Sequence, residues 1–219
     1  DDLVAADSPG RALVKSRDFP ELYGFLDIAV KPNIVLYDRY SVDSFAACVA
    51  ARSVLKGSAK YVGVHRGACM DDLPPDIDIN GDVVAMLGVS WEVESMHDLV
   101  QQCEWLLVLE TNKSIDHTLE GFKYPNCMLI LEPDMGAAAL TWNLFRPQEP
   151  VPALLRALED KELGRNLLRD SVAFARGFDS AIDVEIPSDE VLYHNKHFED
   201  FDLLLDGGGR PTIRSAVEE

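Results

Sequence analysis

The sequence predicts an α/β fold, a doubly wound parallel sheet of about five strands that is flanked by helices. Short apolar runs recur along the chain, and segments whose apolar residues have helical spacing lie between them. Apolar runs of this length are typical of strands that are buried on both faces. Strands that alternate with helices favour right-handed βαβ units, in which neighbouring strands run parallel.

Five segments carry the strand pattern, at residues 33–37, 60–65, 82–88, 105–109 and 127–131. Helices are predicted between and after them, at residues 44–55, 95–103, 136–145, 151–158 and 163–178. The first helix is rich in alanine, which suits close packing on a sheet, and Gly57 is predicted to end it. Residues 71–81 are acidic and contain prolines, so they are predicted to form a loop.

The chain divides into three parts by composition. Residues 1–32 are expected to be an N-terminal extension, in which 19–26 could form a short amphipathic helix. Residues 33–178 are expected to form the α/β domain. Residues 179–219 are polar and irregular at first, and we interpret them as a C-terminal extension or linker.

The charge of the chain argues against general nucleic-acid binding. Of its 219 residues 38 are acidic and 20 basic, which gives a net charge of −18. Such a surface repels phosphate backbones unless the basic residues gather locally, and here they are scattered. The longest apolar runs are also too short to span a bilayer, so we expect no membrane span.

The cysteines indicate a reducing environment. Cys48, Cys69, Cys103 and Cys127 form no CxxC pair, and most of them fall in predicted helices or strands as small apolar residues. We therefore expect an intracellular protein. The first residue is Asp1 rather than Met, so a removed targeting peptide and an organelle such as the mitochondrion stay open.

Polar or small residues follow three of the predicted strands, where an open parallel sheet places its ligands. Asp38 and Asp43 follow the first strand, Gly88 ends the third, and Glu110-Thr111-Asn112 follows the fourth. In order and spacing these segments, together with the tail at 154–163, resemble the motifs of the DHH family of phosphoesterases. The resemblance covers residues 33–178 and implies the N-terminal domain of that family; we expect no counterpart of the family's second domain within residues 179–219.

The resemblance also implies that most metal ligands of the family are replaced. Glu110-Thr111-Asn112 stands where the family has its Asp-His-His signature, and Gly88 stands where it has an Asp. The imidazole expected near Asp38 is missing as well. What remains is a vestigial cleft with the side chains of Asp38, Asp43, Glu110, Asn112 and Asp160. We expect no cofactor; the alternative is one Mg²⁺ or Mn²⁺ held by Asp38, Asp43, Glu110 and Asp160.

Each of these residues also has a structural interpretation. Asp43 could cap the helix that it begins, and Asp160 could cap the helix after it. Asp38 and Glu110 could be solvated groups at strand ends. Other polar groups have weaker functional interpretations: His65 as a phosphate contact, Asp116-His117 as a displaced signature, His194 with His197 as a metal pair, and 207–210 as a glycine-rich substrate loop rather than a turn.

Three functions fit these observations. The first is a catalytically degenerate DHH-like domain that acts as a structural or binding subunit, within a larger protein assembly. The second is a divergent metal-dependent phosphoesterase or exonuclease acting on short oligonucleotides or nucleotides, and the third is a nucleotide-binding regulator. A subunit should expose an apolar patch, for which the candidates are 19–26 and the cluster of Phe198, Phe201 and Leu203 to Leu205; the second cluster could instead pack on the core.

Overall fold

The sheet has five parallel strands in the order β2-β1-β3-β4-β5, which confirms the predicted fold class. This computed structural model describes residues 31–113, 119, 121–168 and 198. The strands are β1 (Ile34–Asp38), β2 (Lys60–Val64), β3 (Val83–Leu87), β4 (Trp105–Glu110) and β5 (Cys127–Leu131). Each of them lies within two residues of a predicted strand at both ends.

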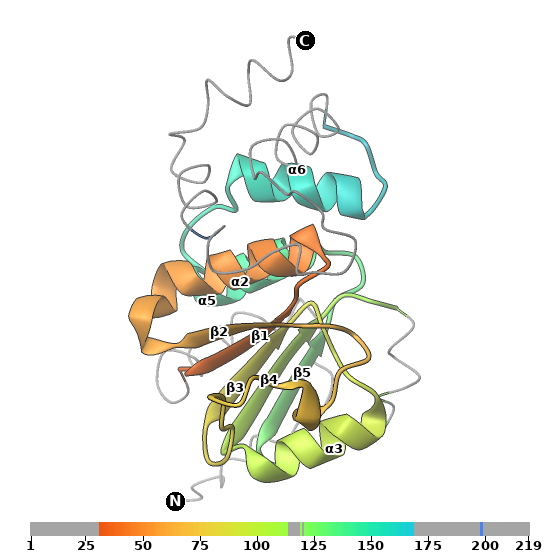
Figure 1. Ribbon diagram of the computed structural model, residues 1–219. Coiled ribbons are helices and arrows are strands. Elements are labelled where there is room, and N and C mark those ends of the chain that lie inside the picture. The colour runs from red at the N-terminus through yellow and green to blue at the C-terminus, as the bar shows by residue number, and fades with distance from the viewer. Residues whose placement is uncertain (1–30, 114–118, 120, 169–197, 199–219) are drawn as a thin grey trace, which may run out of the picture.

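Helices cover both faces of the sheet (Figure 1). On one face lie α2 (Val42–Leu55) and α5 (Ala137–Phe145), and α6 (Ala153–Glu162) packs outside them. On the other face lies α3 (Val93–Gln102). There are two short 3-10 helices in the described residues. The first, η2 (Lys56–Ser58), directly follows α2, and the second, η3 (Met70–Asp72), lies at the start of the predicted acidic loop. No described helix is long and apolar enough to cross a membrane.

The two faces of the sheet bury separate apolar cores. Alternate strand residues such as Val35 and Leu107 pack beneath α2 and α5, while Leu36 and Val108 pack beneath α3. All residues of β1 and β4 are buried, because both strands lie inside the sheet with helices above and below. This explains why their sequences are continuous apolar runs rather than alternating ones.

Small side chains allow α2 and α5 to approach each other closely, in addition to the packing of the first helix on the sheet that its alanines predict. The alanines at 46, 47, 50 and 51 of α2 and at 137–139 of α5 are almost completely buried. Ser41 caps α2, because its hydroxyl accepts the backbone N–H of Ser44. The helix therefore begins two residues earlier than predicted, and Asp43 lies inside its first turn.

The strand order creates a switch point between β1 and β3. The chain leaves β1 toward the face of α2 and leaves β3 toward the face of α3, so the two connections diverge. In open parallel sheets a ligand crevice forms at the carboxyl ends of such strands. The residues singled out by sequence at 38, 88 and 110 all lie at this end of the sheet.

The predicted helix at 163–178 is wrong for the part that the structure describes. Instead α6 continues to Glu162, and residues 163–168 form a turn with positive φ angles at Gly164 (61°) and Asn166 (50°). The carboxylate of Asp160 accepts the backbone N–H groups of Leu167 and Leu168, which holds the chain in this turn. Residues 169–178 lie outside the described part, as do 1–30 and all of 179–219 except Phe198.

Candidate functional site

Three positions identified from sequence lie side by side on adjacent strands. Tyr37 pairs with Leu87 and Leu87 pairs with Leu109, so the residues after them stand in one row across the sheet. These residues are Asp38, Gly88 and Glu110. The row crosses the switch point, with Gly88 between two carboxylates. The three positions thus follow one another across the sheet, at the ends of β1, β3 and β4, in the same order as along the sequence.

Asp38 is a buried, paired carboxylate. Its side chain accepts the backbone N–H of Tyr40 (2.9 Å) and lies 3.3 Å from the Nε of Arg66. Asp38 is only 6% exposed, so its interpretation as a solvated strand-end group is wrong. Arg66 comes from the loop after β2, and its side chain is 46% exposed, so it reaches over the carboxylate from the solvent side. Its Nη2 also donates to the carbonyl of Gly88 (3.4 Å).

Ser44, in the first turn of α2, joins the ends of β1 and β3 on the face of the sheet that α2 covers. Its hydroxyl accepts the backbone N–H of Asp38 (2.7 Å) and donates to the carbonyl of Leu87 (2.6 Å). The side chain is 1% exposed, so both hydrogen bonds are shielded from water. A buried hydroxyl with both roles satisfied fixes the two strand ends relative to each other. The first turn of α2 therefore closes the switch point on this face.

Gly88 cannot be replaced by a larger residue without moving the backbone. Its φ angle is +64°, a conformation that L side chains rarely adopt. A Cβ atom at this position would lie 2.8 Å from the Cβ of Ala137 and 3.2 Å from the Cβ of Ser44. The space that a side chain at 88 would need is therefore filled by the first turns of α5 and α2.

Glu110 is fully buried and accepts three hydrogen bonds. Its Oε2 accepts the hydroxyl of Ser90 (3.0 Å), and its Oε1 accepts the backbone N–H groups of Thr111 (2.9 Å) and Asn112 (3.0 Å). Its exposed fraction is 0%, so the solvated interpretation is wrong here too. The triplet Glu110-Thr111-Asn112 is thus a small turn in which the first side chain binds the next two amides. The described contact of Asn112 with this carboxylate is through its backbone N–H.

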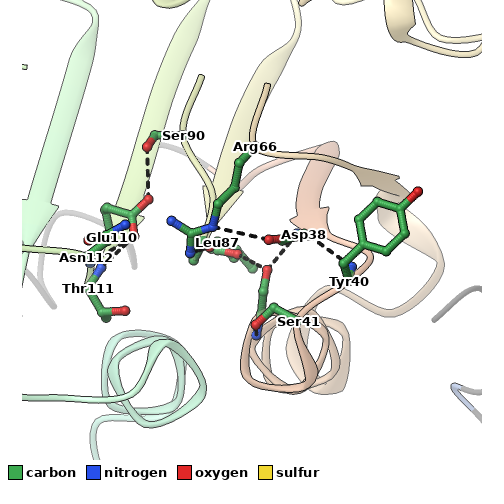
Figure 2. A network of polar contacts seen from close by, with 11 residues as sticks. Asp38, Tyr40, Ser41, Arg66, Leu87, Ser90, Glu110, Thr111 and Asn112 are labelled. Carbon is green, nitrogen blue, oxygen red and sulfur yellow. Dashed lines mark hydrogen bonds and ion pairs between the residues drawn. The ribbon is translucent and has the colours of Figure 1, made fainter. Parts of the chain in front are cut away.

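The two carboxylates form separate polar groups in Figure 2. Asp38 lies with Tyr40, Ser41 and Arg66, whereas Glu110 lies with Ser90 and the next two residues of its own loop. The guanidinium of Arg66 lies between the groups in this view, but its ion pair is with Asp38. Sequence reasoning treated Arg66 as one of several scattered basic residues and did not single out Ser90. Their positions just beyond the ends of β2 and β3 were the available signal.

Asp43 caps a helix, but a different helix from the one that it begins. Its Oδ2 accepts the backbone N–H of Ala137 (2.6 Å), and its Oδ1 accepts that of Ala138 (3.1 Å). These are the first two residues of α5, whose own N-cap, Gly136, has no side chain to offer. Asp43 is 4% exposed. The prediction of an N-cap role for α2 is corrected, because Ser41 has that role.

Glu159 completes the cap of α5. Its Oε1 accepts the backbone N–H of Gly136 (3.0 Å) from the neighbouring helix α6. Three successive amides at the start of α5, at 136–138, are therefore bound by two carboxylates from α2 and α6. A helix N-terminus attracts anions through its free amides and its dipole, and here protein side chains occupy that place.

Burial raises the pKa of Asp43 to about 6. Loss of water around the carboxylate is the largest cause; hydrogen bonds from Ala138 and Ala137 lower the pKa, and the nearby charges of Glu162 and Glu159 raise it. The group therefore becomes protonated under mildly acidic conditions. Loss of its charge would weaken the cap on α5, since an ionised acceptor binds amides more strongly.

Asp160 contacts the turn after α6. Both of its carboxylate oxygens accept backbone N–H groups there, from Leu167 (3.0 Å) and Leu168 (3.1 Å). The predicted role, a cap on the helix that follows, is not shown, because residues 163–168 form a turn and residues 169–178 lie outside the described part. His65 lies beyond β2. The pKa of Asp72 is lowered mainly by hydrogen bonds from the backbone and side chain of Cys69, with smaller contributions from His65 and Arg39. The Asp116-His117 pair, His194, His197 and residues 207–210 lie outside the described part.

The described side chains do not converge on a metal-binding arrangement. In residues 31–113, 119, 121–168 and 198, no three His, Cys, Asp or Glu side chains come together in a geometry that could hold a metal ion. The contacts of the four predicted ligands explain this, because Asp38, Asp43, Glu110 and Asp160 each bind a different set of protein groups. Comparison of the chain with protein-family models, curated proteins and solved structures found no match.

Proposed function

We propose that this chain is a DHH-like α/β domain without metal-dependent hydrolysis, which acts as a structural or binding subunit of a protein assembly. The single observation that carries the proposal is the contact of Asp43 with α5. In the resemblance, Asp43 stands at a metal-ligand position. Here both of its oxygens accept backbone amides, at 2.6 and 3.1 Å, and the side chain is 4% exposed.

The packing around Gly88 supports the same proposal. At the position of Gly88 the family has an aspartate, which bridges its two metal ions. In this chain Gly88 lies between Asp38 and Glu110 in the row of strand ends. A Cβ atom at Gly88 would lie 2.8 Å from Ala137, so even alanine would force α5 to move. A single reverse substitution would therefore not rebuild the centre. Removal of several ligands that act as a unit is expected to abolish turnover rather than reduce it.

The separation of Asp38 from Glu110 is a third line of support. Two metal ions in a hydrolytic site clamp one phosphate and need carboxylates that face a shared space. Asp38 forms an ion pair with Arg66, and Glu110 accepts three hydrogen bonds, from Ser90 and two backbone amides. Both carboxylates thus serve to hold strand ends and loops in place, at positions that the resemblance assigns to metal ligands.

The test combines metal titration with hydrolysis. The purified full chain is titrated with Mn²⁺ and Mg²⁺ by calorimetry, while cleavage of a dinucleotide and of a short oligonucleotide is followed in parallel. We expect no saturable heat of binding and no turnover. Micromolar binding accompanied by turnover that Asp38→Asn abolishes would overturn the proposal and favour the divergent phosphoesterase. Asp98→Asn is the matched control, because Asp98 is exposed on α3, away from the strand ends.

A further inference from the structure

Phe198 is buried in the α/β domain although it belongs to the C-terminal extension. It is 3% exposed and is part of the core between the sheet and α2. The sequence makes Phe198 a candidate for an exposed apolar patch, with packing on the core as the alternative. For Phe198 the alternative is correct. Beyond residue 168 it is the one residue whose placement the structure describes, so its contacts show where this part of the chain meets the domain.

The ring of Phe198 lies among four side chains, which we call the aromatic socket: Tyr37, Phe45, Arg52 and Tyr61. It stacks on Phe45 with ring centroids 5.2 Å apart and an interplanar angle of 6°. It meets Tyr61 and Tyr37 edge-on, at 5.6 and 6.3 Å. The guanidinium carbon of Arg52 lies 5.0 Å from the centroid of the Phe198 ring. These are favourable geometries for aromatic pairs and for a cation over a ring.

The fold builds the socket from three elements at one edge of the sheet. Phe45 and Arg52 are seven residues apart on α2, which places them on the same face of the helix, two turns apart. Tyr37 comes from β1, and Tyr61 comes from β2, the edge strand. Gly63, which pairs with Tyr37, leaves room for the Tyr37 side chain, because a Cβ there would lie 3.2 Å from its hydroxyl.

Charge complements the apolar contact. The residues after Phe198 in sequence are Glu199, Asp200, Phe201 and Asp202, an acidic stretch in an acidic protein. Most of the surface of a chain with net charge −18 would repel such a segment. The socket instead presents Arg52, so it combines aromatic surface with positive charge. This combination suits a short acidic segment that inserts one aromatic ring.

We propose that the aromatic socket is a docking site for the C-terminal segment of this same chain, with Phe198 as the anchor. Phe198 then ties the C-terminal part of the chain to the edge formed by α2 and β2. The inference is independent of the proposed function, because the socket lies on the α2 face beside β2 and contains none of the strand-end carboxylates.

The test cuts the full chain between the domain and the anchor. A specific protease site is inserted between residues 183 and 184, in the polar stretch before Phe198, and the folded protein is cleaved. We expect the C-terminal fragment to co-elute with the domain on gel filtration. A peptide spanning residues 192–205 should displace it. The same peptide with Phe198→Ala should need at least about 30-fold higher concentration, since truncation of a buried aromatic anchor has effects of this size.

Three results would overturn the docking proposal: release of the fragment after cleavage at the inserted site, equal competition by the two peptides, or a dimer in light scattering, which would assign the anchor to a second copy. Because both peptides compete on the same cleaved chain, whose domain residues are unchanged, the comparison does not depend on the folding of a variant. Within the cleavable chain, Tyr61→Ala should weaken retention of the fragment. Tyr40→Ala is the matched control, since this tyrosine is 49% exposed and lies outside the socket.

Discussion

The carboxylate of Asp43 on α2 lies 2.6 Å from the backbone nitrogen of Ala137, the first residue of α5. This hydrogen bond joins two helices through residues that are 94 positions apart in sequence, and it places a buried acid at the positive end of a helix. Because the pKa of Asp43 is raised to about 6, the contact is also sensitive to pH.

The free energy of unfolding should fall as the pH rises from about 4 to about 6, through the contribution of Asp43. In the unfolded chain this group titrates at its ordinary pKa of 3.8, whereas in the folded chain it stays protonated up to about pH 6. Between these values the folded state binds more protons, so raising the pH favours unfolding. The full effect is on the order of 3 kcal/mol.

Asp43→Asn should remove this contribution. We would measure urea denaturation of the wild type and the variant from pH 4 to pH 7 and compare the two curves at each pH. The difference between them cancels the titration of the groups that do not interact with Asp43 and should change across this range. Parallel curves would show that Asp43 titrates normally and that its burial does not affect its charge.

Gly88→Ala should destabilise the fold by about 2–4 kcal/mol, through a strained backbone and an overpacked contact with Ala137. Equilibrium denaturation measures this directly. Gly57→Ala is the control, because a Cβ at Gly57 would meet nothing within 4 Å and its φ angle is not positive; we expect a change within about 0.5 kcal/mol. A variant at 88 as stable as the wild type would mean that the strand ends are looser than their packing indicates.

Ser90→Ala should cost about 1–3 kcal/mol, because it leaves one oxygen of the fully buried Glu110 without its side-chain donor. Combining it with Glu110→Gln in a double-mutant cycle isolates the pair, whose coupling should lie between about 0.5 and 3 kcal/mol. The four stabilities come from denaturant titrations at one pH. Strict additivity of the two substitutions would rule out a direct interaction.

Among the four cysteines, Cys69 should be the first to react with a thiol reagent in the folded protein. It is partly exposed, whereas Cys48, Cys103 and Cys127 are buried. Burial raises the pKa of the Cys103 thiol to about 11 and that of Cys127 to about 12, which suppresses the reactive thiolate. Labelling at pH 8 followed by mass spectrometry of the digest gives the order. Modification of Cys103 before Cys69 would contradict the burial of α3 against the sheet.

The fold class and the five strands could be predicted because they depend on local patterns. Continuous apolar runs such as Leu106–Leu109 are visible in the sequence, and so is the alanine-rich face of α2. The helix predicted at 163–178 failed at its start because Asp160 and Gly164 turn the chain, and neither the side-chain contact nor the positive φ angle shows in an apolar pattern.

The site could be predicted as a set of positions but not as a set of contacts. Strand-end residues such as Asp38 and Glu110 do meet at one edge, because parallel strands bring their carboxyl ends together. Whether a carboxylate faces a ligand or a backbone amide depends on distant partners. Asp43 and Ala137 are 94 residues apart, and Ala137 also occupies the space beside Gly88. No local sequence pattern therefore indicates that α5 lies where a ligand would bind.

If the proposed function is correct, the carboxylates at the strand ends and at Asp43 bind protein groups and not metal ions. Titration of the isotope-labelled full chain with paramagnetic Mn²⁺, followed through backbone amide signals, tests it most directly. We predict that the amides of Ala137, Ala138 and Asn112 keep their intensity at micromolar Mn²⁺, apart from the weak uniform broadening that any acidic surface gives. Selective loss of these signals, while exposed Asp98 on α3 is unaffected, would place a metal ion at Asp43 and Glu110 and contradict the account.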